Sequence, residues 1–364
     1  MIRVPVTTPS RSYEVLIGSG LLSRAGEVLG NFLTNRRAYI VTVPPVRRHW
    51  AKILVQSLTA AGIETVLLEM PDGERAKRLA TLEKLAEQLV KQGADRGATL
   101  IALGGGVVGD VTGFLASIYM RGVEVIQAPT TVLAQVDAAI GGKTGVNLLS
   151  GKNLLGTFHQ PRAVLVDPAV LETLPAREYR AGLYESLKCG IIGDAGLFRL
   201  FEEKHKEILA RDPAVVEKVI ADSVRLKASV VSADEREGGL RQVLNLGHTI
   251  GHALEAETGY KVVLHGEAVG WGLLAATHIA LSTGKLDSVT AGRIMNAVLG
   301  LGELPRMSVK TANIMKRLKF DKKTRQGMVH FILPREIGKV EITSDVGEAV
   351  VRAAVEEIRK LARN

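Results

Sequence analysis

The sequence has a single cysteine, Cys189, among its 364 residues. One thiol excludes both a disulfide framework and a zinc site built from cysteines. Aromatic residues make up only 4% of the chain, which argues against a stacking platform for single-stranded nucleic acid. Long apolar runs, a signal peptide, internal repeats and low-complexity segments are also missing. We therefore expect a cytoplasmic protein with no membrane contact.

The sequence also has no long cluster of like charges. Lysine and arginine exceed aspartate and glutamate by 47 to 38, yet the basic residues occur at most in pairs such as Arg36-Arg37, Arg47-Arg48 and Lys322-Lys323. Without a basic tract we expect no nucleic-acid partner. The excess positive charge fits a solvated surface, and it also fits cations gathered around an anionic substrate.

The length and the 46% apolar content predict two domains. Strands and helices alternate in the first half, which predicts an α/β dinucleotide-binding domain with a doubly wound, mostly parallel sheet over residues 1–175. Helical periodicity dominates afterwards and predicts a mainly α-helical metal- and substrate-binding domain over 176–364. We expect the active site in the cleft between them. The expected strands are 12–17, 38–43, 64–69, 98–103, 124–128, 163–167 and 328–333. The expected helices are 21–29, 46–61, 79–91, 111–119, 177–190, 196–210, 213–234, 243–258, 268–283, 289–300 and 346–363.

A glycine-rich turn follows the apolar run at 98–103. Gly104, Gly106 and Gly109 have the spacing G-x-G-x-x-G between a strand and a helix, a geometry that holds a pyrophosphate on backbone N–H groups. This pattern alone is weakly specific, because glycine turns between strands and helices are common. Glu124 stands where an acidic residue would hold the ribose, but it lies in an apolar, strand-like run, which makes the match doubtful.

Three of the eight histidines fall within positions 248–265. His248 and His252 stand four apart, so on a helix they share one face, and Asn245 and Glu255 extend the same polar stripe. Neutral imidazole is a common zinc ligand, and two or three histidines with a carboxylate would form a catalytic metal site. The alternative is a helix with two hydrogen-bonded or surface histidines.

Further polar clusters have both a structural and a functional interpretation. Gly141-Gly142-Lys143-Thr144 resembles part of a P-loop, but Asp137 stands where the first glycine belongs, so we reject an ATP site. Glycines beside lysine still suit a bound anion. Glu185 and Lys188 lie one turn apart and form either a surface ion pair or a metal ligand beside a substrate cation. For Lys227 and Glu237, solvated surface is the default.

The ordered set of motifs resembles the 3-dehydroquinate synthase family, within the sugar phosphate cyclases. The resemblance spans about residues 71–333. The motifs are Leu103-Gly104-Gly105-Gly106-Val107-Val108-Gly109-Asp110, Tyr119-Met120-Arg121-Gly122, Pro129-Thr130-Thr131, Gln135-Val136-Asp137, Gly141-Gly142-Lys143-Thr144, Gly151-Lys152-Asn153, Leu244-Asn245-Leu246-Gly247-His248-Thr249 and His265-Gly266-Glu267-Ala268-Val269.

The resemblance implies a site, residue by residue. Zn²⁺ or Co²⁺ would be held by Glu185, His248 and His265, and His252 would become a substrate residue. NAD would be contacted by Asp72, Gly73, Glu74, Arg75, Lys77, Gly106, Val107, Val108, Gly109, Asp110, Thr130, Thr131, Lys143, Lys152 and Thr173. Substrate or catalytic residues would be Asp137, Lys143, Asn153, Lys188, Lys227, Glu237, Arg241, Asn245, His252 and, at the phosphate, Lys322 or its neighbour Lys323. Arg121 would enter the neighbouring subunit's site, which implies a homodimer.

The implied activity is that of a phosphate-eliminating carbon–oxygen lyase. It converts 3-deoxy-D-arabino-heptulosonate 7-phosphate to 3-dehydroquinate and phosphate by transient NAD-dependent oxidation, β-elimination, reduction, ring opening and intramolecular aldol closure. Two rivals share this architecture. A sister cyclase would act on a sugar phosphate without a carboxylate, against which Arg241 argues. A metal-dependent polyol dehydrogenase is disfavoured by Val107 and Glu185.

Overall fold

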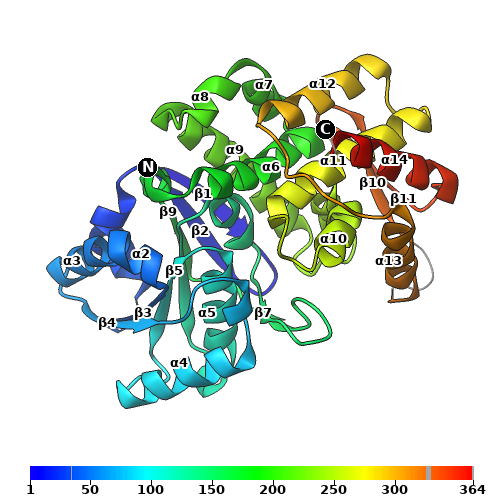
Figure 1. The fold of residues 1–364 in the computed structure, drawn as a ribbon. Coiled ribbons are helices and arrows are strands. Elements are labelled where there is room, and N and C mark those ends of the chain that lie inside the picture. The colour runs from blue at the N-terminus through cyan, green and yellow to red at the C-terminus, as the bar shows by residue number, and fades with distance from the viewer. Residues whose placement is uncertain (34, 325–328, 363–364) are drawn as a thin grey trace. The chain divides into compact units, whose positions relative to one another are not determined.

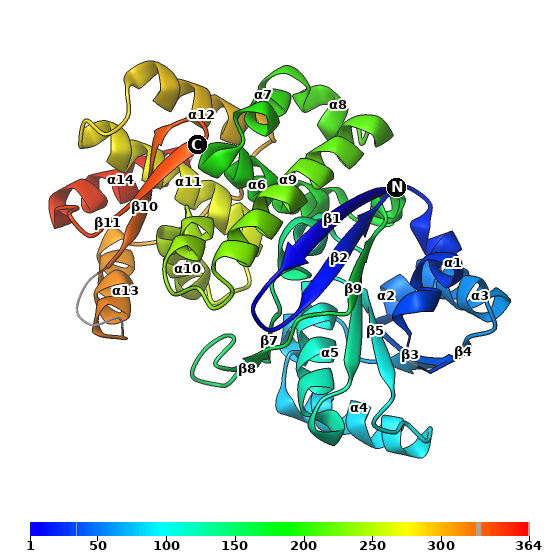
Figure 2. The same cartoon turned by 180° about the vertical axis from the view of Figure 1, so that it is seen from behind.

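The computed structural model describes residues 1–33, 35–324 and 329–362, without the side chains of residues 319–324 (Figures 1 and 2). Its contacts divide the chain into two compact units. The N-terminal unit comprises Met1–Pro175 with Val216–Arg236, and the C-terminal unit comprises Ala176–Val215 with Glu237–Asn364. The expected domain boundary between residues 175 and 176 stays a prediction. By its contacts, the segment Val216–Arg236 belongs to the N-terminal unit.

The N-terminal unit contains a seven-stranded sheet in the order β1-β2-β9-β6-β5-β3-β4 within the described residues. Only the β1–β2 pair is antiparallel, so the sheet is mostly parallel, which confirms the expected fold class. The strands are β1 (Ile2–Thr7), β2 (Ser12–Ile17), β3 (Arg37–Thr42), β4 (Glu64–Glu69), β5 (Thr99–Gly104), β6 (Glu124–Pro129) and β9 (Ala163–Val166), with a separate hairpin of β7 (Lys143–Val146) and β8 (Leu155–Phe158). The helices are α1 (Ala25–Leu29), α2 (Pro44–Val46), α3 (Lys52–Ala60), α4 (Leu79–Lys91), α5 (Gly106–Ile118) and most of α9 (Pro213–Ala233).

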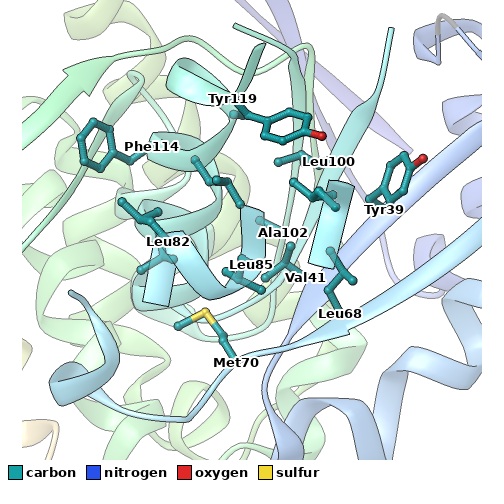
Figure 3. Packing of buried hydrophobic residues seen from close by; sticks show 14 of the residues in the cluster. Tyr39, Val41, Leu68, Met70, Leu82, Leu85, Leu100, Ala102, Phe114 and Tyr119 are labelled. Carbon is teal, nitrogen blue, oxygen red and sulfur yellow. The ribbon is translucent and has the colours of Figure 1, made fainter. Parts of the chain in front are cut away.

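Side chains along each strand point alternately to the two faces of this sheet, and each face has its own hydrophobic core. In β3, Tyr39 and Val41 pack with helices α4 and α5, while Ile40 packs with α1 and α3 on the other face. In β5, Leu100 and Ile101 divide in the same way. Successive side chains of a strand point to opposite faces, so buried parallel strands are apolar throughout. Figure 3 shows the first of these cores.

The C-terminal unit is mainly helical. Its elements are α6 (Ala176–Gly193), α7 (Ala195–Glu203), α8 (His205–Leu209), α10 (His248–Glu257), α11 (His265–Ser282), α12 (Ser288–Gly300), α13 (Thr311–Thr324) and α14 (Glu348–Leu361), with a hairpin of β10 (Phe331–Glu336) and β11 (Lys339–Thr343). Helix α11 packs against α6, α10, α12 and α14. Among the described residues, no helix has the length and apolarity needed to cross a membrane.

The expected helix 243–258 is wrong at its beginning. A 3₁₀ segment, η8 (Leu240–Asn245), ends before Gly247, whose φ of +80° interrupts the helix, and α10 begins at His248. Asn245 is therefore not part of the histidine stripe. A Cβ at Gly272 of α11 would lie 1.8 Å from the carbonyl oxygen of Gly247, so this break touches α11 backbone to backbone.

Candidate metal centre and nucleotide-binding turn

Three histidines of the C-terminal unit converge. His248 and His252 lie one turn apart on α10, and His265 is the first residue of α11. One ring nitrogen of each lies within 4.8 Å of the others, which makes the three a possible metal-binding group. The sequence predicted that His248 and His252 share a face. The approach of His265 depends on the packing of α11 against α10.

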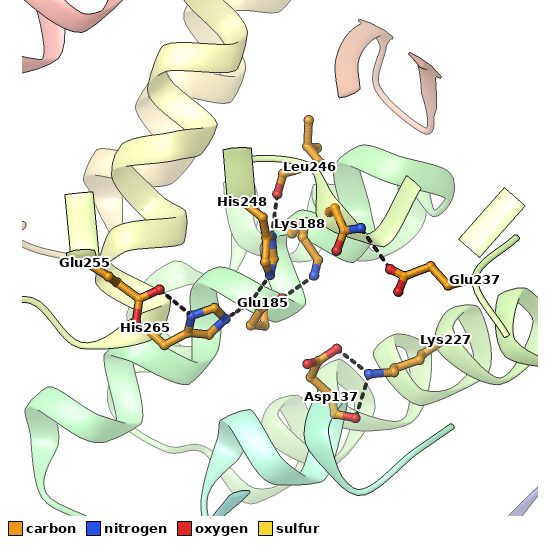
Figure 4. Close-up of polar contacts among 10 residues, drawn as sticks. Asp137, Glu185, Lys188, Lys227, Glu237, Leu246, His248, Glu255 and His265 are labelled. Carbon is orange, nitrogen blue, oxygen red and sulfur yellow. Dashed lines mark hydrogen bonds and ion pairs between the residues drawn. The ribbon is translucent and has the colours of Figure 1, made fainter. Parts of the chain in front are cut away.

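Glu185 brings a carboxylate to the same point from α6. Its side chain is 1% exposed, and its Oε1 lies 3.5 Å from Nε2 of His248 and 3.4 Å from Nε2 of His265 (Figure 4). Neither carboxylate oxygen has a hydrogen-bond partner, although Lys188, one turn along α6, forms an ion pair with Oε2. A buried carboxylate costs free energy unless positive charge or donors compensate it. Lys188 compensates the charge at Oε2, while Oε1 faces the two histidine rings, where a metal ion would add to this compensation.

In His248 and His265, the hydrogen-bond partner of Nδ1 determines which ring nitrogen can bind a metal. Nδ1 of His248 lies 3.1 Å from the carbonyl oxygen of Leu246, and Nδ1 of His265 lies 3.1 Å from Oε2 of Glu255. A carbonyl and an ionised carboxylate only accept hydrogen bonds, so both Nδ1 atoms donate. In the neutral rings each Nε2 then has a lone pair directed toward Glu185. Two imidazoles and a carboxylate arranged in this way suit Zn²⁺ or Co²⁺.

The electrostatics of this group reflect its burial and its close charges. Burial lowers the pKa of His248 well below its usual value, and the charge of Lys188 lowers it further. Burial opposes ionisation of Glu185, but Lys188 and the histidines outweigh it and lower the pKa of the carboxyl well below its usual range. Burial lowers the pKa of His265, but the nearby carboxylates of Glu185 and Glu255 outweigh burial and raise it to about 10.

Several expected substrate residues are buried cations. Lys188 and Arg241 of the C-terminal unit are 1% and 2% exposed, and Lys227 of the N-terminal unit is 6% exposed. Lys227 forms an ion pair with the carboxylate of Asp137 and donates to its carbonyl oxygen at 2.6 Å. Arginine keeps its charge when buried, so Arg241 lies in surroundings that compensate a cation. The solvated-surface interpretation of Lys227 is wrong.

Two further expected residues of the C-terminal unit contact each other. The Nδ2 of Asn245 donates to Oε1 of Glu237 at 2.9 Å. Glu237 has a φ of +60°, a left-handed conformation unusual for a residue other than glycine. His252 is exposed, in contrast to His248. The side chain of Lys322 lies outside the described residues.

The glycine motif lies at the junction of β5 and α5: Gly104 ends β5, and Gly106 and Gly109 belong to α5. The expected beginning of this helix at residue 111 is wrong, because α5 begins at Gly106. A Cβ at Gly104 would lie 2.5 Å from the side chain of Val108, and one at Gly109 would lie 2.8 Å from Oε1 of Gln127. Gly104 is therefore required for the close packing of strand and helix, whereas a Cβ at Gly109 would displace the end of the Gln127 side chain. Gly106 begins α5 and leaves its first backbone N–H groups at the turn.

Other expected nucleotide residues are joined to this turn. Lys77, only 4% exposed, forms an ion pair with Asp110 and donates to Oδ1 of Asn153. Burial raises the pKa of Asp110 although the charge of Lys77 opposes this. Nδ2 of Asn147 donates to Oε1 of Glu74 at 2.7 Å. Asn147 was not among the expected nucleotide residues, because its contact with Glu74 joins positions 73 residues apart.

The remaining expected residues are placed as follows. Thr130 is buried, Thr131 Oγ1 accepts from Ala134 N at 3.1 Å, and Thr173 Oγ1 accepts from Trp50 Nε1 at 2.9 Å. Asp72, Gly73, Arg75, Arg121 and Lys143 are exposed, Val108 is buried, and Val107 and Lys152 are half-buried. Glu124, the doubtful ribose residue, forms a two-pronged ion pair with Arg11 at 2.7 Å for each contact, which disfavours a ribose role.

Family models agree with the resemblance in the sequence. A model described as 3-dehydroquinate synthase N-terminal matches residues 67–181, and one described as 3-dehydroquinate synthase C-terminal matches residues 182–324. A 3-dehydroquinate synthase from Koribacter versatilis (strain Ellin345) is 56% identical over 100% of this chain and 99% of its own length.

Solved structures with the same fold include two sugar phosphate cyclases. The 2-epi-5-epi-valiolone synthase from Streptomyces hygroscopicus subsp. jinggangensis 5008, with NAD⁺ and Zn²⁺ bound, has a TM-score of 0.89 and 31% identity, covering 97% of this chain and 98% of that chain. A 2-deoxy-scyllo-inosose synthase in complex with carbaglucose-6-phosphate, NAD⁺ and Co²⁺ has a TM-score of 0.84 and 25% identity, covering 99% of each chain.

Proposed function

The chain belongs to the 3-dehydroquinate synthase family, and from this premise we propose that it converts 3-deoxy-D-arabino-heptulosonate 7-phosphate into 3-dehydroquinate and phosphate. The observation that carries the proposal is the convergence of His248, His265 and Glu185 on one point, with Nε2 of each histidine within 3.5 Å of the carboxylate. This reaction belongs to the shikimate pathway of aromatic amino acid biosynthesis, which would place the enzyme in the cytoplasm.

We propose that the enzyme works with NAD and with Zn²⁺ or Co²⁺. Support comes from the donor set around Glu185 and from the two solved cyclases, one with NAD⁺ and Zn²⁺ and one with NAD⁺ and Co²⁺. Bound NAD supplies a hydride acceptor that is regenerated within each turnover, and the divalent ion supplies a Lewis acid for the substrate hydroxyls. Glu185, His248 and His265 would hold the ion, and the glycine turn with the residues from Asp72 to Lys77 would hold the nucleotide.

The protein's own side chains would bind and orient a doubly anionic substrate. Its carboxylate would pair with Arg241, whose planar guanidinium suits two-pronged contacts, and its phosphate with lysines. Asp137, Asn245 and His252 would orient hydroxyls and move protons. Confinement of the substrate keeps the intermediates in a productive geometry. The other proposed contacts are Lys143, Asn153, Lys188, Lys227, Glu237 and Lys322.

A sister cyclase is the second candidate, because the valiolone synthase is similar over nearly the whole chain. Such an enzyme would use a sugar phosphate that has no carboxylate. Arg241 favours the heptulosonate, because a planar guanidinium suits the carboxylate that this substrate has and such sugar phosphates lack.

The deciding experiment is a turnover assay of the full chain with heptulosonate 7-phosphate, a catalytic amount of NAD⁺ and Zn²⁺. Phosphate, dehydroquinate and net NADH are recorded together. We expect equal amounts of phosphate and dehydroquinate and no net NADH. Net NADH from simple polyols without phosphate release would favour a dehydrogenase. Inactivity with heptulosonate but turnover of a carboxylate-free sugar phosphate would establish the sister cyclase.

We also propose a homodimer in which Arg121 contributes to the site of the neighbouring subunit. Arg121 is exposed and has a φ of +71°, next to Met120 at +50° and Gly122 at +122°. Because three consecutive residues have positive φ angles, the backbone of this segment has a defined conformation. We expect sedimentation to report a dimer. Mixing inactive Arg121→Ala with inactive His265→Ala should restore part of the activity, whereas a monomer that keeps full activity would contradict the proposal.

A further inference from the structure

Glu255 has no assigned role, although it lies on the histidine face of α10. It follows His248 by seven positions and His252 by three, so the three side chains share one face of the helix. Glu255 is only 3% exposed. Burying a carboxylate is costly unless donors replace its water, and one such donor is Nδ1 of His265, 3.1 Å from Oε2 (Figure 4).

The backbone brings His265 within reach of Glu255. A Cβ at Gly251 of α10 would lie 2.9 Å from the carbonyl oxygen of Ala268, so α10 and α11 approach each other closely. The carboxylate of Glu267 accepts from the backbone N–H of Leu264 at 2.7 Å and also binds Arg177, which holds the first turn of α11 in place. These contacts place the backbone of His265 and leave the orientation of its ring to side-chain contacts.

We propose that Glu255 is a positioning residue for the metal: it accepts the Nδ1 hydrogen of His265 and so presents Nε2 to an ion held with Glu185 and His248. The inference rests on the metal site of the proposed function. A carboxylate is a stronger acceptor than a neutral carbonyl, so it makes the imidazole a better metal donor. The Nδ1 of His248 instead faces the neutral carbonyl oxygen of Leu246. Glu255 therefore makes His265 the stronger of the two ligands.

A purely structural role for Glu255 makes different predictions. In that case its removal would lower the unfolding temperature of the metal-stripped protein and leave the metal affinity of the folded fraction unchanged. A positioning role instead changes the affinity itself. Glu255→Gln separates the two effects of the carboxylate, because the amide oxygen can still accept from Nδ1 but carries no charge.

The test uses the full chain stripped with a chelator. Zn²⁺ affinity is measured by competition with a chromophoric chelator, the visible spectrum is recorded with Co²⁺, and the unfolding temperature is followed without metal. Glu257→Gln is the matched control, because it lies on the same helix but its carboxylate contacts Asn313 and Arg317. We expect Glu255→Ala to weaken Zn²⁺ binding by about 10- to 100-fold, Glu255→Gln to fall between it and the parent, and the control to match the parent.

The outcomes separate the inference from the proposed function. Unchanged Zn²⁺ affinity and an unchanged Co²⁺ spectrum in Glu255→Gln and Glu255→Ala would overturn the positioning role while leaving the proposed function intact. If Glu255→Ala does not fold, the result for Glu255→Gln decides. Failure of the unaltered chain to bind Zn²⁺ would refute the proposed metal site and the inference together.

Discussion

Oε1 of Glu185 lies 3.5 Å from Nε2 of His248, which joins α6 to α10 at the candidate metal centre. Two ligand sets are compatible with this contact. One consists of Glu185, His248 and His265, and the other of His248, His252 and His265, whose nitrogens lie within 4.8 Å of one another. The sets differ only in the exchange of Glu185 for His252.

Substitution at these two positions distinguishes the ligand sets. If Glu185 is a ligand, Glu185→Gln should lose more Zn²⁺ affinity than the about 10- to 100-fold typical of an outer-shell contact, because a neutral amide replaces a coordinating charge. His252→Ala should then keep the metal and lose turnover. Equilibrium dialysis with metal analysis measures the first effect, and phosphate release measures the second. A metal-free His252→Ala with metal-bound Glu185→Gln would establish the three-histidine set.

Arg241→Ala should affect the substrate far more than the nucleotide. Loss of a charge-assisted contact of about 1.5–3 kcal/mol corresponds to a rise in KM for heptulosonate 7-phosphate of about 10- to 100-fold, with the Kd for NAD unchanged. Arg241→Lys, which keeps the charge but not the planar geometry, should recover part of the loss. Because Arg241 is buried, the unfolding temperature is measured alongside. Equal losses for substrate and NAD would indicate misfolding and contradict the assignment.

Gly266→Ala should disturb the metal centre through the backbone. A Cβ at Gly266 would lie 1.8 Å from the carbonyl oxygen of Ala181, so α11 must move away from α6 and carry His265 with it. We expect a loss of about 1–3 kcal/mol in the free energy of unfolding and weaker Zn²⁺ binding. Gly292→Ala in α12 is the control. A Cβ there meets nothing within 4 Å, and the change should stabilise the helix by about 0.5–1 kcal/mol. A Gly266→Ala protein as stable as the parent would contradict this prediction.

The Arg11–Glu124 pair should make stability depend on pH. Burial opposes ionisation of Glu124, but its hydrogen bonds to Arg11 outweigh it and lower the pKa of the carboxyl below 4.5. A lowered folded pKa means that the pair stabilises the protein above the unfolded pKa and loses this effect as pH falls through the folded pKa. Arg11→Ala should therefore cost about 1–2 kcal/mol at pH 7 and progressively less below pH 4.5.

Thermal unfolding between pH 7 and pH 3 checks this dependence. Arg3→Ala serves as the control, because its pair with Glu14 is largely exposed and should contribute little. Combining Arg11→Ala with Glu124→Gln should cost less than the sum of the two single changes. A pH-independent difference between Arg11→Ala and the parent would show that the pair contributes through packing alone.

Local patterns predicted many of the regular elements but missed β7, β8, β11 and α13. The bounds of α4 (Leu79–Lys91) and β4 (Glu64–Glu69) agree with the expected 79–91 and 64–69, because one shows clear helical amphipathicity and the other is an apolar strand run. Strand β1 was missed, since Pro5 lies in it at the sheet edge, where the pattern is weak. The break before His248 was also missed, because it depends on the contact of Gly247 with Gly272 of another helix.

By itself, the sequence determined the fold class, the family and the pairing of His248 with His252. Periods of 2 and 3.6 residues and ordered motifs are local properties that need no knowledge of distant contacts. The family resemblance implied that Glu185 and His265 join His248, whereas residue spacing could not. Only the tertiary structure decided the distances between these groups, and that Glu255 supports one histidine while a carbonyl supports the other. These relationships depend on glycines that let α6, α10 and α11 touch, and spacing along one chain cannot encode the distance between separate helices.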